Sequence, residues 1–174
     1  SSTRVLTRLT ESIPESSGKV GDNISINAIL SAAKVLKAHI QANNALPDYV
    51  ILNDEQYTLS QFLYLMSKAI VNINGGNLGD IAVVGASSPS TPSGDRITSN
   101  LNKTEYLDVA SRVSQYIINN GQAPNYASSS AGKISYSELL DAFSRILAYY
   151  ADNSKTLPNS VFINNTMDSG ASVK

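Results

Sequence analysis

The chain has 174 residues, of which 42% are hydrophobic and 16% are charged, and 13 Lys and Arg residues nearly balance 14 Asp and Glu residues. This balance argues against nucleic-acid binding and against a polybasic membrane-surface module, because both need a clustered excess of basic residues. The lack of cysteine excludes thiolate metal sites and cysteine nucleophiles, and a single histidine, His39, argues against a catalytic triad. No apolar run approaches the ~20 residues of a membrane span, so we expect no membrane insertion, no cofactor and no metal.

The chain repeats itself at a fixed interval. The segment YLDVASRV at 106–113 returns as LLDAFSRI at 139–146, and ILSAAKVL at 29–36 returns after the same interval as FLYLMSKA at 62–69. The two pairs are themselves related by a longer interval, because SQFLYLMSKAI at 60–70 matches SELLDAFSRIL at 137–147. Self-similarity of this kind predicts tandem structural units that stack on one another.

The repeats group into two similar halves. We expect the first repeat pair over residues 1–85, with Ile13-Pro14 marking a partial N-terminal unit of a longer array, and the second pair over residues 101–168. A loop rich in Ser, Pro and Gly is predicted between them at residues 86–100, and a tail at residues 169–174. The sequence leaves open whether the halves share one core.

Each unit is predicted to begin with a capped helix. A polar residue stands before each helix, where its side chain can accept a hydrogen bond from a first-turn N–H. These residues are Asn27, Ser60, Thr104 and Ser137. Apolar residues then recur at helical spacing. The helices are expected to end where Asn or Gly tolerates the left-handed conformation, at residues 43–44, 75–76, 119–121 and 152–153.

A proline corner and a β-ribbon are predicted after each helix. The corners are Leu46-Pro47, Leu78-Gly79, Ala123-Pro124 and Leu157-Pro158. Short strands are predicted at residues 49–52, 81–84 and 160–163, with residues 57–59, 24–26 and 134–136 as the returning strands. The predicted fold is therefore mainly α with small β-ribbons. It is a tandem repeat of capped helix, Leu-Pro corner and short β-hairpin, packed as two similar halves.

The repeated residues resemble those of a known family. The pattern is apolar-x-x-Ala-Ser-Arg-Val followed by Tyr-Ile-x-x-Asn-Gly-x-x-Pro-Asn-Tyr, as it stands at 106–127, with further matches at 137–163 and 29–70. It is similar to the pseudomurein-binding repeat, which occurs in surface proteins and wall-lytic enzymes of methanogenic archaea. The similarity is weakest at 71–84, where Leu78-Gly79-Asp80 replaces Leu-Pro-Asn.

The resemblance implies a non-enzymatic, extracellular role. Such a chain would attach a larger surface protein or wall-lytic enzyme to the glycan or peptide of pseudomurein, the cell-wall polymer. A binder of this polymer is expected to use aromatic faces for sugars, Asn and Asp for hydroxyls, and Arg or Lys for carboxylates. The candidate ligand-binding residues, which form a basic helix row and a set of corner residues, are Lys68, Arg112, Arg145, Asp48, Tyr49, Asn125, Tyr126 and Asn159.

Structural interpretations compete with this one. The basic row can be solvated or paired with Asp108 or Asp141 at helical spacing, and the corner residues are common turn formers or ribbon anchors. Tyr116, Tyr149 and His39 share one helix position, and we expect them to be partly buried packing residues. The alternative function is a structural spacer or protein–protein interaction repeat of a surface protein. A hydrolase is disfavoured because the carboxylate spacings follow the repeat. The oligomeric state is not predicted.

Overall fold

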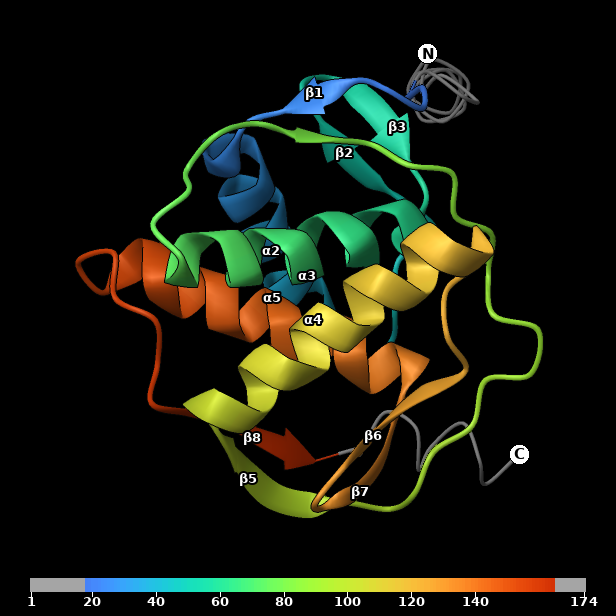
Figure 1. Cartoon of the computed structure of the whole chain (residues 1–174), viewed down its shortest axis with the longest axis vertical. Coiled ribbons are helices and arrows are strands. Elements are labelled where there is room, and N and C mark those ends of the chain that lie inside the picture. The colour runs from blue at the N-terminus through green and yellow to red at the C-terminus, as the bar shows by residue number, and fades with distance from the viewer. Residues whose placement is uncertain (1–17, 165–174) are drawn as a thin grey trace, which may run out of the picture.

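Four long helices make the centre of the molecule. The computed structural model describes residues 18–164, so the predicted N-terminal partial unit and the tail at 169–174 lie outside the described residues. The helices are α2 (Ile26–Asn43), α3 (Leu59–Asn74), α4 (Lys103–Asn120) and α5 (Tyr136–Asp152) (Figure 1). Together with short antiparallel strand pairs they confirm the prediction of a mainly helical fold with small ribbons.

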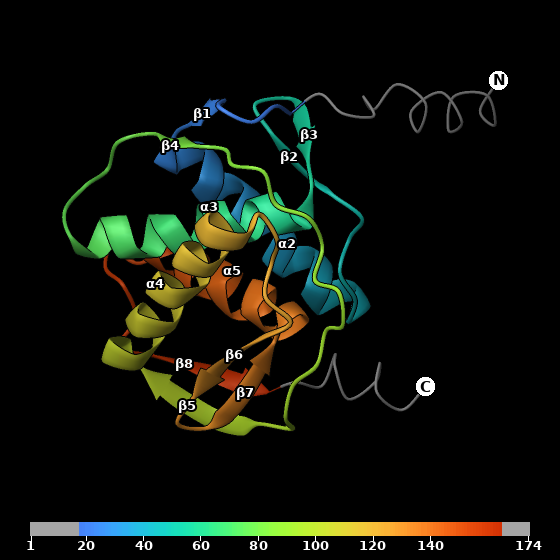
Figure 2. The same ribbon diagram turned by 45° about the vertical axis from the view of Figure 1, so that its right-hand side comes forward.

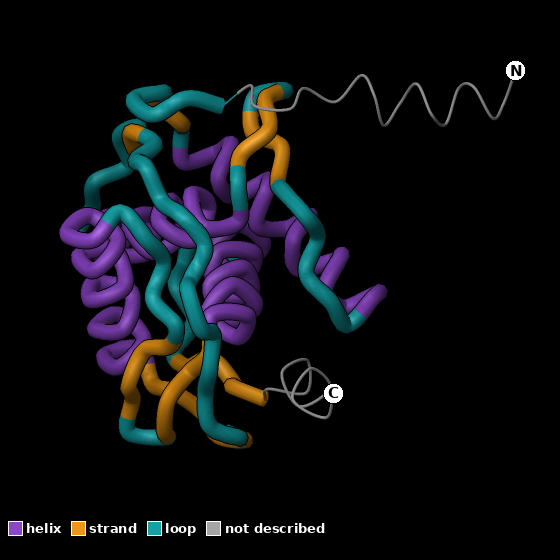
Figure 3. Tube along the Cα trace, turned by 90° about the vertical axis from the view of Figure 1, so that its right-hand side faces the viewer, coloured by secondary structure: helices purple, strands orange, loops and turns teal. Residues whose placement is uncertain are grey.

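The strands form two-stranded ribbons at the two ends of this helical layer (Figure 3). They are β1 (Asn23–Ile24), β2 (Val50–Leu52), β3 (Glu55–Tyr57), β4 (Ile81–Ala82), β5 (Thr98–Asn102), β6 (Tyr126–Ser129), β7 (Gly132–Ser135) and β8 (Ser160–Asn164). The pairs β2–β3 and β6–β7 are hairpins, the first of them as predicted, whereas the strand β6 of the second was not predicted. The pairs β1–β4 and β5–β8 instead join the first and last strands of each half. The prediction of a hairpin in every unit is therefore wrong, because β1–β4 and β5–β8 each join strands that two packed helices separate along the chain.

The helix starts differ from the prediction by two residues. The N-cap residues are Ser25, Thr58, Asn102 and Ser135, and each side chain accepts a hydrogen bond from a backbone N–H three residues later. The polar residues predicted as caps therefore lie inside the first turn. The predicted helix ends are confirmed. Asn44 and Gly121 adopt the left-handed conformation directly after α2 and α4.

The two halves correspond at the longer interval of the sequence repeat through both of their helices, and their last strands correspond with a shift of three residues. Both follow the order β-α-β-β-α-β, and the caps Ser25 and Asn102 are equivalent. The strand pairing is equivalent too, since Asn23 pairs with Ala82 in the first half and Asn100 pairs with Phe162 in the second, although Phe162 comes three residues later than the interval between the helices would place it. Helix α2 therefore corresponds to α4, α3 to α5, and β4 to β8.

The halves share one core. Helix α2 packs on α5, the corresponding α4 packs on α3, and α3 also packs on α5 (Figure 2). The buried hydrophobic side chains, including Phe62 and Phe143, form one continuous cluster. The buried hydroxyls of Ser60 and Tyr136 share a 2.9 Å hydrogen bond between the halves. None of the helices in residues 18–164 is long and apolar enough to cross a membrane.

The segment 83–97, which we call the linker, runs from the ribbons of the first half to those of the second (Figure 2). It is bonded to the second half along its path. The N–H of Ser87 donates to the carbonyl of Gly121 at 3.0 Å, and the N–H of Asp95 donates to the carbonyl of Lys133 at 2.8 Å. The predicted loop at 86–100 is thus an extended segment attached to the second half, and its last residues belong to β5.

Candidate functional site

The basic row lies on three helices, and its two arginines are paired with carboxylates one turn earlier. Arg112 Nε lies 2.9 Å from Asp108 Oδ2, and its Nη2 donates to the carbonyl of Ser128 at 2.6 Å. Both side chains of this pair are exposed. The structure thus confirms the paired interpretation for Arg112. Lys68, at the equivalent position of α3, is half-buried.

Arg145 has the same local pairing in a different environment. Its Nη2 lies 2.9 Å from Asp141 Oδ2 and 3.5 Å from Glu138 Oε2. The Glu138 side chain is 1% exposed and that of Arg145 is 24% exposed. Sequence spacing indicated Asp141 as a partner, but it gave no sign that Glu138 is buried beneath the guanidinium.

The corner residues make contacts within the chain. Asn125 Oδ1 accepts a hydrogen bond from the N–H of Thr91 in the linker at 2.8 Å. Lys133 Nζ lies 4.7 Å from the centroid of the Tyr126 ring, which remains partly exposed. Asn125 therefore holds the linker in place through a contact distant in sequence, which is a structural use other than the local turn that was predicted, and the Lys133 ammonium lies over the Tyr126 ring.

The other corner residues lie in the first and fourth units. Asp48 and Asn159 are exposed, and Tyr49 is half-buried. The carbonyl of Asn159 accepts a hydrogen bond from the N–H of Lys103 at 2.8 Å. This contact gives the corner of the fourth unit a structural use, and the side chains of Asp48 and Asn159 lie on the surface.

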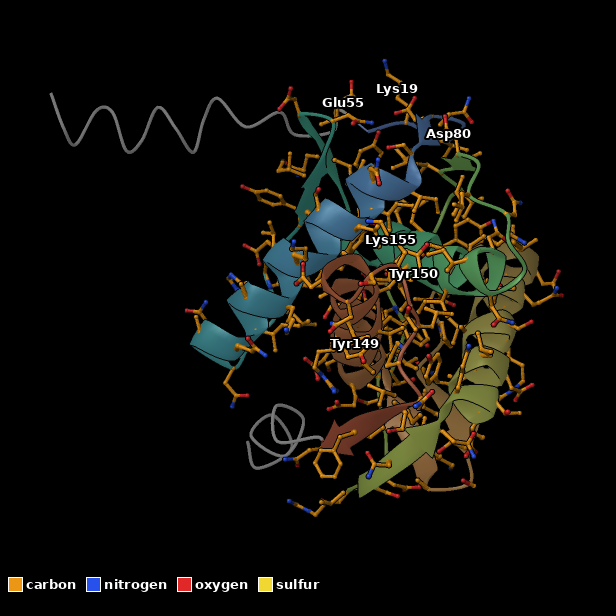
Figure 4. The ribbon with its side chains drawn as sticks, turned by 90° about the vertical axis from the view of Figure 1, so that its left-hand side faces the viewer. Lys19, Glu55, Asp80, Tyr149, Tyr150 and Lys155 are labelled. Carbon is orange, nitrogen blue, oxygen red and sulfur yellow. The ribbon has the colours of Figure 1, made fainter. Side chains whose placement is uncertain are left out.

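A groove lies between α2, α5 and β8. Its volume is about 400 Å³, and it continues into a hollow of about 250 Å³ that shares Gln41, Arg145 and Phe162 with it. The aromatic side chains of Tyr149 and Phe162 line the groove with exposures of 43% and 44%. Figure 4 shows Tyr149 on α5, facing the side of the molecule where α2 and β8 lie. Of the predicted ligand-binding residues, the structure places Arg145 in this groove.

Sequence reasoning missed most of the groove. Phe162 gave no signal because an apolar residue in a strand is ordinarily a packing residue. Gln41 and Lys37 lie on α2, far earlier in the chain than the α5 residues that they face. Tyr149 was expected to pack, although 43% of its side chain remains accessible. The exposed aromatic at a repeated helix position was the one signal that could have indicated it.

Comparison with family models identifies the second half. A model of the pseudomurein-binding repeat matches residues 97–129 and again 130–163. Residues 97–163 match two tandem pseudomurein-binding repeats. The boundary between them lies in the β6–β7 turn, so one pseudomurein-binding repeat consists of β5–α4–β6 and the other of β7–α5–β8. Comparison with curated proteins gives no match.

Proposed function

We propose that this chain is a non-catalytic module that binds pseudomurein and anchors a larger surface protein or wall-lytic enzyme to the cell wall, outside the cell. The tandem pseudomurein-binding repeats at 97–163 are the observation that carries this proposal. The first half supports it, because the same order of elements recurs there in the same repeat register. We describe the repeated unit as a strand, a capped helix, a corner and a second strand.

The binding surface in this proposal combines one groove with several weaker contacts. Arg145 contributes through the groove between α2, α5 and β8. Lys68, Arg112 and the corner residues contribute shallow contacts on the outside of the repeats. Individually weak contacts to one polymer add through effective concentration, which suits a module that must stay on an insoluble wall without a covalent bond.

Sedimentation with purified wall material tests the proposal. The chain is incubated with pseudomurein sacculi and, as a control, with murein sacculi, and the fraction in the pellet is measured. We expect the chain to sediment with pseudomurein and to stay in solution with murein. Equal partitioning with and without pseudomurein would overturn the proposal and favour a structural spacer or protein–protein interaction repeat.

The non-catalytic part of the proposal has its own measurement. Sacculi incubated with the chain should release no more soluble sugar or peptide than sacculi incubated with buffer. Release above that level would show that the chain cleaves the polymer that it binds.

A further inference from the structure

We infer that the groove between α2, α5 and β8 holds one uncharged sugar ring of the wall glycan, and that residues 18–164 form a single site of this kind. The inference rests on the proposed function and specifies which component of the polymer the groove recognises. It depends on the side chains that line the groove, on their charges, and on a comparison with the equivalent place in the other half.

The walls of the groove suit a sugar ring. Tyr149 from α5 and Phe162 from β8 keep much of their aromatic surface exposed. Aromatic faces pack well against the C–H face of a sugar and leave its hydroxyls free. The amides of Gln41 and Asn153 also line the groove, and Asn153 Nδ2 already donates to the carbonyl of Tyr149 at 2.9 Å. The Gln41 amide can both donate and accept hydrogen bonds. A volume of about 400 Å³ lies within the usual range for small-molecule sites.

The charges in and beside the groove compensate one another. Arg145 is paired with Asp141 and Glu138. Asp152, which lines the groove, lies 2.9 Å from Lys34 Nζ.

Lys37 also lines the groove, so the charged groups in and beside it are three carboxylates and three cationic side chains. A carboxylate ligand would have to compete with these internal partners for Arg145 and for Lys34, and the equal numbers of carboxylates and cations leave the set without net charge to attract it. The groove therefore favours an uncharged ring over an acidic sugar or an acidic peptide.

The equivalent place in the other half lacks these features. By the sequence repeat, Asn72 is the equivalent of Tyr149, and Ile118 is the equivalent of Gln41. The strand pairing makes Ala82 the equivalent of Phe162. The linker also passes through this equivalent place. The N–H of Ser87 donates a hydrogen bond to the carbonyl of Gly121, and Gly121 is the equivalent of Asn44, which lines the hollow next to the groove. The aromatic groove is therefore formed once among residues 18–164.

Four alanine variants test the site. Tyr149→Ala and Phe162→Ala remove the two groove aromatics. Tyr116→Ala and Ile51→Ala are the matched controls, because they lie at the equivalent repeat positions with similar exposure but outside the groove lining. Sedimentation with pseudomurein sacculi gives the half-saturating concentration of each variant. We expect a rise of about tenfold for each groove variant and less than twofold for the controls.

Salt and competition identify the component that is bound. The contribution of the groove is measured as the half-saturating concentration of Tyr149→Ala divided by that of the unaltered chain. We expect this ratio to stay constant from about 0.05 M to about 0.5 M NaCl, since binding of an uncharged ligand is not screened by salt. Glycan strands freed of peptide should displace the chain, and wall peptides freed of glycan should not. Tyr149→Phe keeps the ring and should bind as the unaltered chain does, which covers the case of an alanine variant that fails to fold.

The outcomes separate the two proposals. If the unaltered chain does not sediment with pseudomurein, the proposed function fails. If it sediments but the groove variants bind as the controls do, the groove assignment is overturned and the function stands. Displacement by peptide rather than glycan, or a groove contribution that disappears at high salt, would also overturn the assignment.

Discussion

Arg145→Gln and Arg112→Gln change the same repeat position in two environments. At Arg112 the pair with Asp108 is exposed on both sides, with side-chain exposures of 46% and 64%. At Arg145 the cation lies over Glu138, whose side chain is 1% exposed. Glutamine keeps much of the length of the side chain and removes the charge of the guanidinium together with its hydrogen bonds, so the comparison shows how burial changes the contribution of the ion pair.

The expected loss of stability in each variant depends on how deeply its ion pair is buried. Exposed ion pairs typically contribute about 0.2–1 kcal/mol, so Arg112→Gln should lower the free energy of unfolding by less than about 1 kcal/mol. Removing one partner of a buried pair costs roughly 3–5 kcal/mol. Because Arg145 is itself 24% exposed and 3.5 Å from Glu138, we expect about 2–3 kcal/mol for Arg145→Gln. For a chain of this size that corresponds to a fall in Tm of roughly 4–12 °C.

Urea denaturation followed by circular dichroism measures both variants. The double variant Arg145→Gln/Glu138→Gln should regain part of the lost stability, since it removes the buried charge together with its partner. Equal losses for Arg112→Gln and Arg145→Gln would refute the reasoning. So would a double variant that is less stable than Arg145→Gln alone.

Three further predictions concern other parts of the chain. Hydrogen bonds, first that from the backbone N–H of Lys19, hold the pKa of Asp22 below its ordinary value. The stability that Asp22 adds is therefore present above its unfolded-state pKa and lost as pH falls through the folded-state pKa, and Asp22→Asn should flatten acid denaturation followed by circular dichroism. Asn125→Ala removes the acceptor of a linker N–H, so limited proteolysis should cut the linker faster without weakening sedimentation with sacculi by more than about twofold, the change expected when one exposed contact is lost. Tyr106→Phe removes the buried hydroxyl that donates to the carbonyl of Pro158, and urea denaturation should show a loss of about 1–3 kcal/mol.

The helices could be predicted because local signals define them. Apolar spacing gave their bodies, and residues such as Asn44 and Gly121 gave their ends. Their starts were placed two residues late, because the first helical positions of α2 and α3 are Ile26 and Leu59, apolar residues that also continue the preceding extended pattern. The β1–β4 and β5–β8 pairs could not be predicted, since two packed helices separate their strands along the chain.

The candidate site, like the fold, could be predicted only where the signal lies within one helix. The pairing of Arg112 with Asp108 and of Arg145 with Asp141 follows from helical spacing and could be foreseen. The groove could not, because it exists only where α2 of the first half packs on α5 of the second. Gln41 and Phe162 belong to different repeats, so no spacing within one repeat indicates that they lie in the same groove.

The difference between the halves lies in surface positions rather than in the core. Apolar residues persist at buried positions such as Ile24 and its equivalent Leu101. On the outer helix face, however, Ser31 and Val35 stand in α2 where Asp108 and Arg112 form an ion pair in α4. The first half therefore retains the fold without this surface chemistry, and α2 supplies a wall of the groove. A fragment cut to the two matched repeats would expose the face of α5 that α2 covers and would lose the groove, so the smallest complete binding unit under the proposed function comprises both halves.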